Sequence, residues 1–559
     1  MPVVSNSLST GQDTADSALP LARTGAGETL AIALFAICAV ILKALALLHY
    51  RFDSDEPQHL HVAWGWTAGL LQYRDVFDNH APLFHILTAP ILAAVGERAN
   101  ILIYMRCAML PLLGIALWAT WDITRRSYSD RAAIWSVLLL ALFPPFFLKS
   151  LEYRTDNLWN TIWIVALLLV LRPAAHPRQW FAIGSLLGIA MAVSLKTPLL
   201  IVTLAVCGAI VAATQKTVPR RRVARSALAG LAGFLIVPSC ILAYFWYRGA
   251  LHDLWYCTVA FNSAISDTRP QRLLLLILYP AGLLVIARVA LRHARRSHSD
   301  AERFHRRLLV VLMVPVYILT LVCIWPLIST RDFLPLIPVL AILTAGMAEE
   351  SFKSGSPTTG YALTMSALVL LEIAATVVTG TLWKNSTRTQ MAETDQVIHL
   401  TTPADPIMDI KGETIFRRRP FYYIFEFITR EQIARGLIHD RIAAAVITAR
   451  CHVAQADGPF FPPAGRRFLS ENFVDVGRLR VAGQFLEPGG TFHTMIPGEY
   501  LVVTKSGAAT GTLDGTAVGS GRQLLPGLHR FIGGREPAAA IWAPAFRRGF
   551  SPFHHRGIV

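Results

Sequence analysis

Acidic residues crowd a short polar stretch that directly follows an apolar run long enough to cross a bilayer. Asp53, Asp55 and Glu56 stand close together there. Ionisable side chains at a membrane boundary are costly unless they are paired, so by default they mark a functional site. The string Asp55-Glu56-Pro57-Gln58 also fits a simple helix start, with an acid at the N-cap, proline in the first turn and glutamine completing a capping box. The pattern alone leaves both interpretations open.

A second cluster, Glu152-Tyr-Arg154-Thr-Asp156, precedes a later apolar run. If both clusters face the same side of the membrane, their acids can converge on a metal ion or a polar substrate. The simpler alternative is a solvated loop that holds an arginine–acid pair.

Cations stand at the same edges of other apolar runs. Arg331 begins a proline-rich run, and Lys196 lies at the corner between two runs. Snorkelling to lipid phosphate explains both simply. The functional alternative is that they hold the phosphate of a lipid-linked substrate, to which arginine offers a fork and lysine a point charge. His80 is a third candidate for an anionic headgroup, unless its segment only caps a helix that begins at Pro82.

The composition indicates a polytopic membrane protein. Of 559 residues, 53% are hydrophobic and 16% are charged, whereas soluble domains carry about 25% charged residues. The net charge of +16 does not predict a nucleic-acid partner, because the lysines and arginines gather in short loops between apolar runs, as the positive-inside rule describes. Most of the seven cysteines lie in apolar segments, which does not suggest a disulfide framework.

Apolar runs of about 20 residues predict some eleven transmembrane helices. We expect them at about 29–48, 100–121, 132–148, 157–171, 180–195, 199–214, 226–246, 273–291, 308–325, 333–348 and 361–382. The arginine-rich loops between alternate pairs then share one side, which must be cytoplasmic. Residues 49–99 face outward only if the short apolar piece 81–96 does not cross, so we expect that piece to be an interfacial or re-entrant helix.

The chain divides into three parts by composition. Residues 1–27 read as a disordered cytoplasmic tail, 28–383 as the transmembrane domain with outer loop 49–99, and 384–559 as an outward-facing soluble domain. In this last part we expect α/β structure followed by a small β-sheet. The elements expected there are strands at 407–410, 443–447 and 499–504 and a helix at 428–436.

These motifs together resemble the GT-C superfamily of integral-membrane glycosyltransferases. The likeness rests on the Asp55-Glu56 pair in the first outer loop, the acid Asp156 before a later span, and the span Arg331-Asp-Phe-Leu-Pro-Leu-Ile-Pro338. It is strongest to the bacterial relatives of protein O-mannosyltransferases and of the lipid A aminoarabinose transferase. One departure is Asn79-His80-Ala81-Pro82, where that family has a Lys-Pro-Pro motif.

The resemblance implies transfer of a sugar from a polyprenyl-phosphate donor to a hydroxyl of a lipid, glycan or protein acceptor. The enzyme would act at the periplasmic face of a bacterial inner membrane, with the N-terminus cytoplasmic and the C-terminal domain periplasmic. A phosphate leaving group is anionic near neutral pH. One carboxylate therefore suffices to take the proton from the acceptor hydroxyl, and cations stabilise the charge that grows on the phosphate.

Each candidate residue receives a role in this chemistry. The resemblance implies that Asp55 is the base and that Glu56 and Asp156 are orienting or metal-binding acids. A divalent cation, if one takes part, would be held by Asp55 and Asp156. The residues expected to bind the donor phosphate are Arg154, Arg331, Lys196 and His80.

Three alternatives remain at this point. A ligase could move a preassembled glycan from a polyprenyl-diphosphate carrier. A transporter would need polar residues along a pathway through the spans, but Arg106 and Glu372 are the main ones there. A non-catalytic assembly partner could bind glycan through its C-terminal domain.

Overall fold

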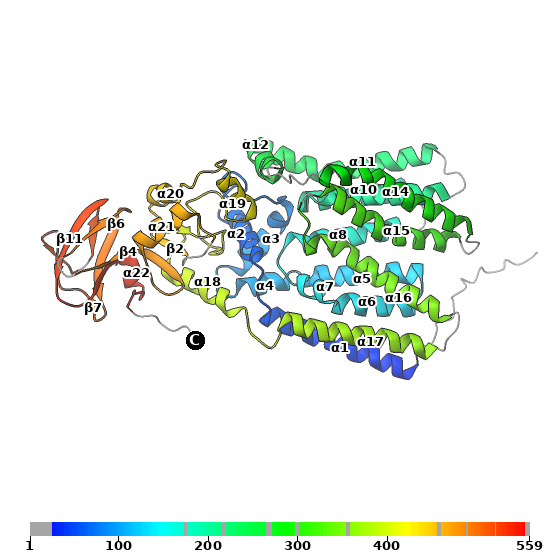
Figure 1. Ribbon diagram of the computed structural model, residues 1–559, viewed down its shortest axis with the longest axis horizontal. Coiled ribbons are helices and arrows are strands. Elements are labelled where there is room, and N and C mark those ends of the chain that lie inside the picture. The colour runs from blue at the N-terminus through cyan, green and yellow to red at the C-terminus, as the bar shows by residue number, and fades with distance from the viewer. Residues whose placement is uncertain are drawn as a thin grey trace, which may run out of the picture.

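Two parts make up the molecule, a bundle of long helices and a C-terminal region of short helices and strands (Figure 1). The computed structural model describes residues 25–172, 176–214, 220–263, 271–296, 301–325, 327–353, 358–455, 460–487, 490–519 and 521–553. The expected disordered tail falls almost entirely outside the described residues.

The helices of the bundle each overlap one expected span. They are α1 Ala26–His49, α4 Ile101–Cys107 with α5 Leu110–Ser127, α6 Asp130–Leu142, α8 Thr155–Val170, α9 Pro177–Val193, α10 Thr197–Thr214, α11 Arg220–Tyr247, α14 Gln271–Arg296, α15 Ala301–Ile324, α16 Ile337–Lys353 and α17 Thr358–Gly380. Within the described residues, eight helical segments are long and apolar enough to cross a membrane, and α6, α8 and α9 are shorter. The polytopic helical fold is confirmed, and the number of spans is approximate.

Prolines divide two of the expected spans. The run 132–148 is split into α6 and a short α7, Pro144–Lys149, because Pro144 lacks the N–H that would continue the helix. The run 333–348 starts with a 3-10 turn, Thr330–Leu336, that leads into α16. Both breaks lie where the chain approaches the polar end of the bundle.

The described basic loops gather at one end of the bundle. Arg131 bonds to Glu28 at the start of α1 at 2.8 Å, and Arg307 at the start of α15 donates to the backbone of Ser127 at 2.7 Å. Arg307 also pairs with Glu350 near the end of α16. The C-terminal region lies at the opposite end (Figure 1). This separation matches the alternation of basic loops expected from the sequence.

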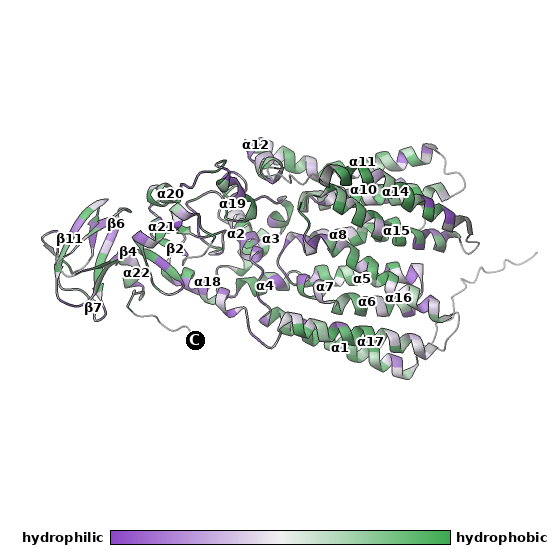
Figure 2. Cartoon of the chain, in the orientation of Figure 1, coloured by the Kyte–Doolittle hydropathy of each residue, from purple (hydrophilic) through white to green (hydrophobic). Residues whose placement is uncertain are grey.

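The helices of the bundle consist mostly of hydrophobic residues (Figure 2), and many of these are exposed. On α14, for example, Leu274, Ile277 and Leu284 are more than half exposed. Exposed apolar patches this extensive indicate contact with lipid. The helices therefore belong to a multi-pass membrane protein.

Two short helices lie at the end of the bundle that faces the C-terminal region. They are α2, Asp55–Thr67, and α3, Leu83–Val95 (Figure 1). With 13 residues, α3 is too short to cross a bilayer, which takes about 20. Its length and position favour the interfacial helix expected at 81–96. A further short segment at this end follows α11, and its elements are α12 Leu251–Trp255, a π-helical turn Tyr256–Ala260 and α13 Phe261–Ser263.

The C-terminal region contains two sheets and several short helices. The helices are α18 Arg388–Leu400, α19 Phe427–Ala434, α20 Ile442–Thr448, α21 Pro463–Asn472 and α22 Ala543–Arg547. The strands are β1 Ile407–Met408, β2 Val453–Gln455, β3 Phe473–Asp475, β4 Leu479–Leu486, β5 Thr491–Thr494, β6 Gly498–Thr504, β7 Gly507–Ala508, β8 Gly511–Leu513, β9 Thr516–Ala517, β10 Arg522–Leu524, β11 Gly527–Gly533 and β12 Ala538–Trp542. The larger sheet has the order β1-β2-β4-β12-β6-β10, with β3 on β4 and β7 on β6, and the smaller has the order β5-β11-β8-β9.

Only one of the four elements expected here has the wrong type. The run 443–447 was expected as a strand but lies in helix α20, because a short alanine-rich apolar run fits either structure and alanine strongly favours a helix. The expected strands near 407 and 499 and the expected helix near 428 are present as β1, β6 and α19.

Candidate active site

Asp55 is the first residue of helix α2, and local hydrogen bonds hold this helix start. The carboxylate of Glu56 accepts the backbone N–H of Asp53 at 2.7 Å, and Asp53 accepts the backbone N–H of Asp55 at 3.2 Å. Ser54 is the N-cap residue, and Gln58 makes no capping bond. The simple capping box that the sequence permitted is therefore wrong. The side chain of Asp55 remains 29% exposed at the helix end.

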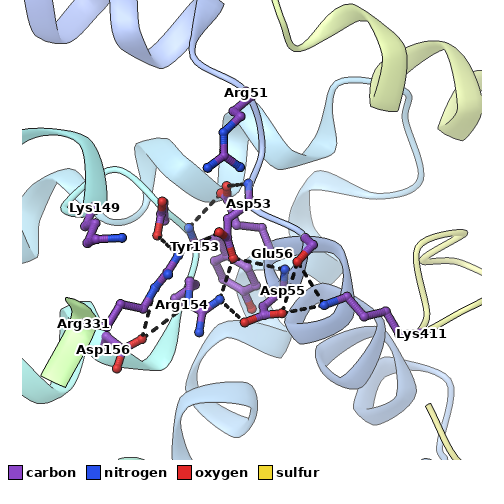
Figure 3. A network of polar contacts seen from close by, with 12 residues as sticks. Arg51, Asp53, Asp55, Glu56, Lys149, Tyr153, Arg154, Asp156, Arg331 and Lys411 are labelled. Carbon is purple, nitrogen blue, oxygen red and sulfur yellow. Dashed lines mark hydrogen bonds and ion pairs between the residues drawn. The ribbon is translucent and has the colours of Figure 1, made fainter. Parts of the chain in front are cut away.

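Arg154 joins the acids of the two outer loops. Its guanidinium contacts Asp53 at 2.6 Å, Asp55, and Asp156 at 3.3 Å (Figure 3). Arg154 is the N-cap residue of α8, and Asp156 lies in the first turn of that helix. The start of α8 thus supplies both a cation and an acid to the start of α2.

Two further cations complete the membrane side of this cluster. Arg331 contacts Asp53 at 2.8 Å and Glu152 at 2.6 Å. Lys196, at the corner between α9 and α10, contacts Asp156 at 3.3 Å and Asp332 at 2.7 Å. Six of the seven residues expected at the site, Asp55, Glu56, Asp156, Arg154, Arg331 and Lys196, are therefore gathered in one network.

His80 lies in a neighbouring cluster and makes no ion pair with this network. Its Nδ1 lies 2.8 Å from a carboxylate oxygen of Asp78, and its ring centroid lies 4.6 Å from that of His59. His59 is buried and contacts the ring of His85 at 3.0 Å. Burial opposes protonation of His80, but Asp78 outweighs it and raises the pKa of His80. His80 therefore contacts the carboxylate of Asp78 and lies against the ring of His59. His59 is one helical turn after Asp55 on α2.

Glu56 holds parts of the fold together from a buried position. It is fully buried and forms a two-point ion pair with Arg106, at 2.5 and 2.8 Å. It also accepts the backbone N–H of Tyr153 at 2.9 Å. Glu56 thereby ties the start of α2 to helix α4 and to the second outer loop.

Lys411 is the residue that the sequence did not predict. It comes from the C-terminal region, and its Nζ lies 2.5 Å from Oδ1 of Asp55 (Figure 3). Its loop is held by Asp409, which accepts the backbone N–H groups of Gly412 and Thr414 at 2.8 and 3.0 Å. Gly412 has φ +88°, and a Cβ there would come within 2.9 Å of His61 on α2. The requirement for glycine reflects this close approach.

The charges around the acids set their protonation. Burial raises the pKa of Asp55, but Arg154 and Lys411 outweigh it and hold that pKa well below its usual value. The pKa of Asp53 is lowered in the same way by Arg154 and Arg331. Glu152 differs, because burial raises its pKa to about 7 despite the opposing charge of Arg331. Near neutral pH, Asp55 is therefore ionised while Glu152 changes its charge.

The residues of this cluster do not fit the divalent cation that we expected at Asp55 and Asp156. Both carboxylates are paired with the guanidinium of Arg154, and each has a lysine as a second partner, Lys411 or Lys196. Metal ligands must present free oxygens, but here protein cations take the place of an ion. Across the described ranges, no group of three or more histidines, cysteines, aspartates and glutamates is arranged to hold a metal ion.

Comparison with known proteins agrees with this architecture. Residues 79–246 match the family model described as dolichyl-phosphate-mannose-protein mannosyltransferase. This segment includes His80, Arg154, Asp156 and Lys196. No curated protein matches the chain.

One solved structure shares the fold at low sequence identity, and a second is similar to a lesser degree. The crystal structure of ArnT from Cupriavidus metallidurans bound to undecaprenyl phosphate is 14% identical, with a TM-score of 0.52 over 82% of this chain and 98% of that chain. The oligosaccharyltransferase AglB from Archaeoglobus fulgidus, in complex with an inhibitory peptide and a dolichol-phosphate, is 12% identical, with a TM-score of 0.46 over 86% and 74% of the two chains. The fold and the matched segment confirm the resemblance to the GT-C superfamily.

Proposed function

We propose, from the premise that this chain has a GT-C fold, that it is a glycosyltransferase. It moves a sugar from a polyprenyl-phosphate donor to a hydroxyl acceptor. The single observation that carries the proposal is the contact of one ionised, partly exposed carboxylate, Asp55, with Arg154, which Asp53 and Asp156 link to Arg331 and Lys196. This arrangement suits a reaction that needs one base and strong stabilisation of a leaving phosphate.

The reaction follows from these positions. The acceptor oxygen attacks the anomeric carbon, and its proton passes to a carboxylate oxygen of Asp55. The bond from that carbon to the phosphate oxygen breaks, and the electron pair stays on the phosphate. Arg154, Arg331 and Lys196 stabilise the charge that grows there. Because attack and departure occur on opposite faces of the sugar, the configuration inverts.

Carboxylates of the protein pair with the cations that would bind the donor phosphate. Arg331 contacts the carboxylates of Asp53 and Glu152, and Lys196 contacts those of Asp156 and Asp332. A donor phosphate can compete for these contacts. The competition becomes easier when Glu152 is neutral, because Arg331 then loses one of its anionic partners.

An apolar cavity supports a lipid-linked donor. It measures about 310 Å³, lies between α1, α5 and α6, and is lined by side chains such as Leu47, Leu113 and Leu117 together with Lys43. The ammonium of Lys43 donates to Ser150 Oγ at 3.0 Å, two residues before Glu152. A prenyl chain in this cavity would lead toward the cations of the site.

Membrane orientation is part of the same proposal. The basic loops would lie in the cytoplasm and the C-terminal region in the periplasm of a bacterial inner membrane. The domain boundaries would fall near residues 27 and 383. Glu56 and Asp156 would orient the reacting groups without contacting a metal.

A donor comparison tests the proposal. The full chain, reconstituted in nanodiscs, is incubated with an envelope extract as the acceptor source. The donors are undecaprenyl-phosphate sugars and, separately, undecaprenyl-diphosphate sugars. We expect consumption of a monophosphate donor, measured as loss of the labelled lipid. Consumption of the diphosphate donor alone would instead indicate a glycan ligase, and no consumption of either would indicate a non-catalytic role.

A further inference from the structure

A cavity of about 440 Å³ is lined by Lys411, which contacts Oδ1 of Asp55, whereas Arg154 contacts the other oxygen of that carboxylate. It is enclosed by α2, by the loop that follows α2, and by the segment 411–424 of the C-terminal region. Pockets that bind small molecules measure about 300–1,000 Å³. Lys411 lines this cavity and also contacts Asp55, so the cavity adjoins the proposed base.

One polar side chain in the wall of the cavity has no partner. Gln58 is 1% exposed, and neither its amide nitrogen nor its amide oxygen has a hydrogen-bond partner among the described residues. Gln58 and Asp55 are three residues apart on α2, so their side chains lie on neighbouring positions of the helix. A buried amide without a hydrogen-bond partner destabilises the fold. A ligand with hydroxyl groups would remove this destabilisation.

The charge of the cavity wall is positive. Lys411, Arg418 and Arg419 line it, against a single carboxylate, that of Asp75. Arg419 pairs with Asp409 at 2.5 Å, and Asp75 pairs with Arg74 at 2.9 Å. Arg418 is exposed and forms no ion pair within the described ranges, although its charge helps to lower the pKa of Asp75. Its guanidinium is therefore available to an anion.

We propose that this cavity binds the acceptor, and that the acceptor is a sugar unit carrying an acidic group, which Arg418 binds. Gln58 then bonds to a hydroxyl of the same unit, next to Asp55. The half-buried ring of Tyr422 forms part of the wall, which suits the apolar face of a sugar ring. The donor phosphate and the acceptor would thus approach Asp55 from opposite sides. This inference rests on the proposed function.

Binding of simple sugars tests the inference without any lipid donor. The full chain in phosphatidylcholine nanodiscs is titrated calorimetrically with glucose, glucose 6-phosphate and glucuronate. One ion-paired hydrogen bond predicts that the two acidic sugars bind about tenfold more tightly than glucose. The variant Arg418→Gln should abolish this preference, Arg418→Lys should keep part of it, and Gln58→Ala should weaken all three sugars.

The matched control is Arg467→Gln, which removes an exposed arginine of α21 outside the cavity and should keep the preference. Equal affinity for glucose and the acidic sugars, or a preference that survives in Arg418→Gln, would overturn the inference. Because the donor is absent, such a failure is distinct from a failure of donor consumption.

A second comparison identifies the source of the acid. Nanodiscs that contain phosphatidylglycerol should weaken binding of glucose 6-phosphate if a lipid headgroup enters the cavity. Unchanged binding would point to an acidic sugar of a glycan.

Discussion

Lys411 and Asp55 form an ion pair of 2.5 Å although 356 residues separate them in the chain. The pair joins the C-terminal region to the first outer loop at the proposed base. Asp55 therefore has one cation from each side, Arg154 from the start of α8 and Lys411 from the C-terminal region. The C-terminal region is in this sense part of the site.

Replacement of Lys411 should shift the pH dependence of transfer. In Lys411→Met, Asp55 loses one of the cations that lower its pKa, so its folded-state pKa should rise. The acid limb of kcat/KM against pH should move to higher pH, because the carboxylate of Asp55 is then protonated, and lost as a base, at a higher pH. Lys411→Arg should keep the original limb. Lys505→Met, in an exposed turn of the C-terminal region, serves as the control, and an unshifted limb in Lys411→Met would contradict this role.

The variant Glu56→Gln should destabilise the folded protein. Removing one partner of a buried ion pair costs about 3–5 kcal/mol, and Glu56→Gln leaves Arg106 without its anion. We expect a clear loss of thermal stability in detergent, measured by Tm. Glu471→Gln, on the exposed face of α21, should leave Tm unchanged. A wild-type Tm in Glu56→Gln would show that Arg106 finds another partner.

Donor binding should weaken as pH rises through 7. Glu152 has a pKa of about 7, so it is mostly neutral below that pH and mostly charged above it. The charged form competes with the donor phosphate for Arg331, and the donor, a phosphodiester, does not itself titrate in this range. KM for the donor should therefore increase from pH 6 to pH 8. Glu152→Gln should remove this increase, and a slope that persists in that variant would assign it to another group.

Chelation should have little effect on transfer. The carboxylates proposed earlier as metal ligands are paired with Arg154, Lys196 and Lys411. After dialysis against EDTA, we expect kcat/KM to change by less than about twofold. Removal of a catalytic metal ion would cause a much larger loss, because such an ion supplies several kcal/mol of transition-state stabilisation. Loss of activity that Mn²⁺ or Mg²⁺ restores would show that a metal ion displaces these side chains.

The sequence predicted which acids and cations of the bundle gather in one network better than it predicted the contribution of the C-terminal region. Asp55, Asp156, Arg154, Arg331 and Lys196 stand at the ends of apolar runs, and the alternation of basic loops places those ends together. Lys411 lies in no such pattern. Its position depends on how the C-terminal region packs on α2, which a pattern of apolar and polar residues does not specify.

Local ambiguity explains the other differences. His80 was expected to bind the donor phosphate, and in the structure its side chain contacts Asp78 and forms no ion pair with the network around Arg154. The short run 443–447 fits a strand or a helix equally well by length, and the structure has the helix α20. Both segments permit more than one local structure, and the contact of His80 joins residues only two apart in the chain.

The most direct test of the account is the turnover of Asp55→Asn. This variant keeps the size of the side chain but removes the base, so transfer from the polyprenyl-phosphate donor should fall by about 10²- to 10⁴-fold. Donor binding and Tm should stay close to those of the unaltered chain. Asp475→Asn, on an exposed strand of the C-terminal region, should transfer normally. Near-normal turnover by Asp55→Asn would contradict the assignment of Asp55 as the base.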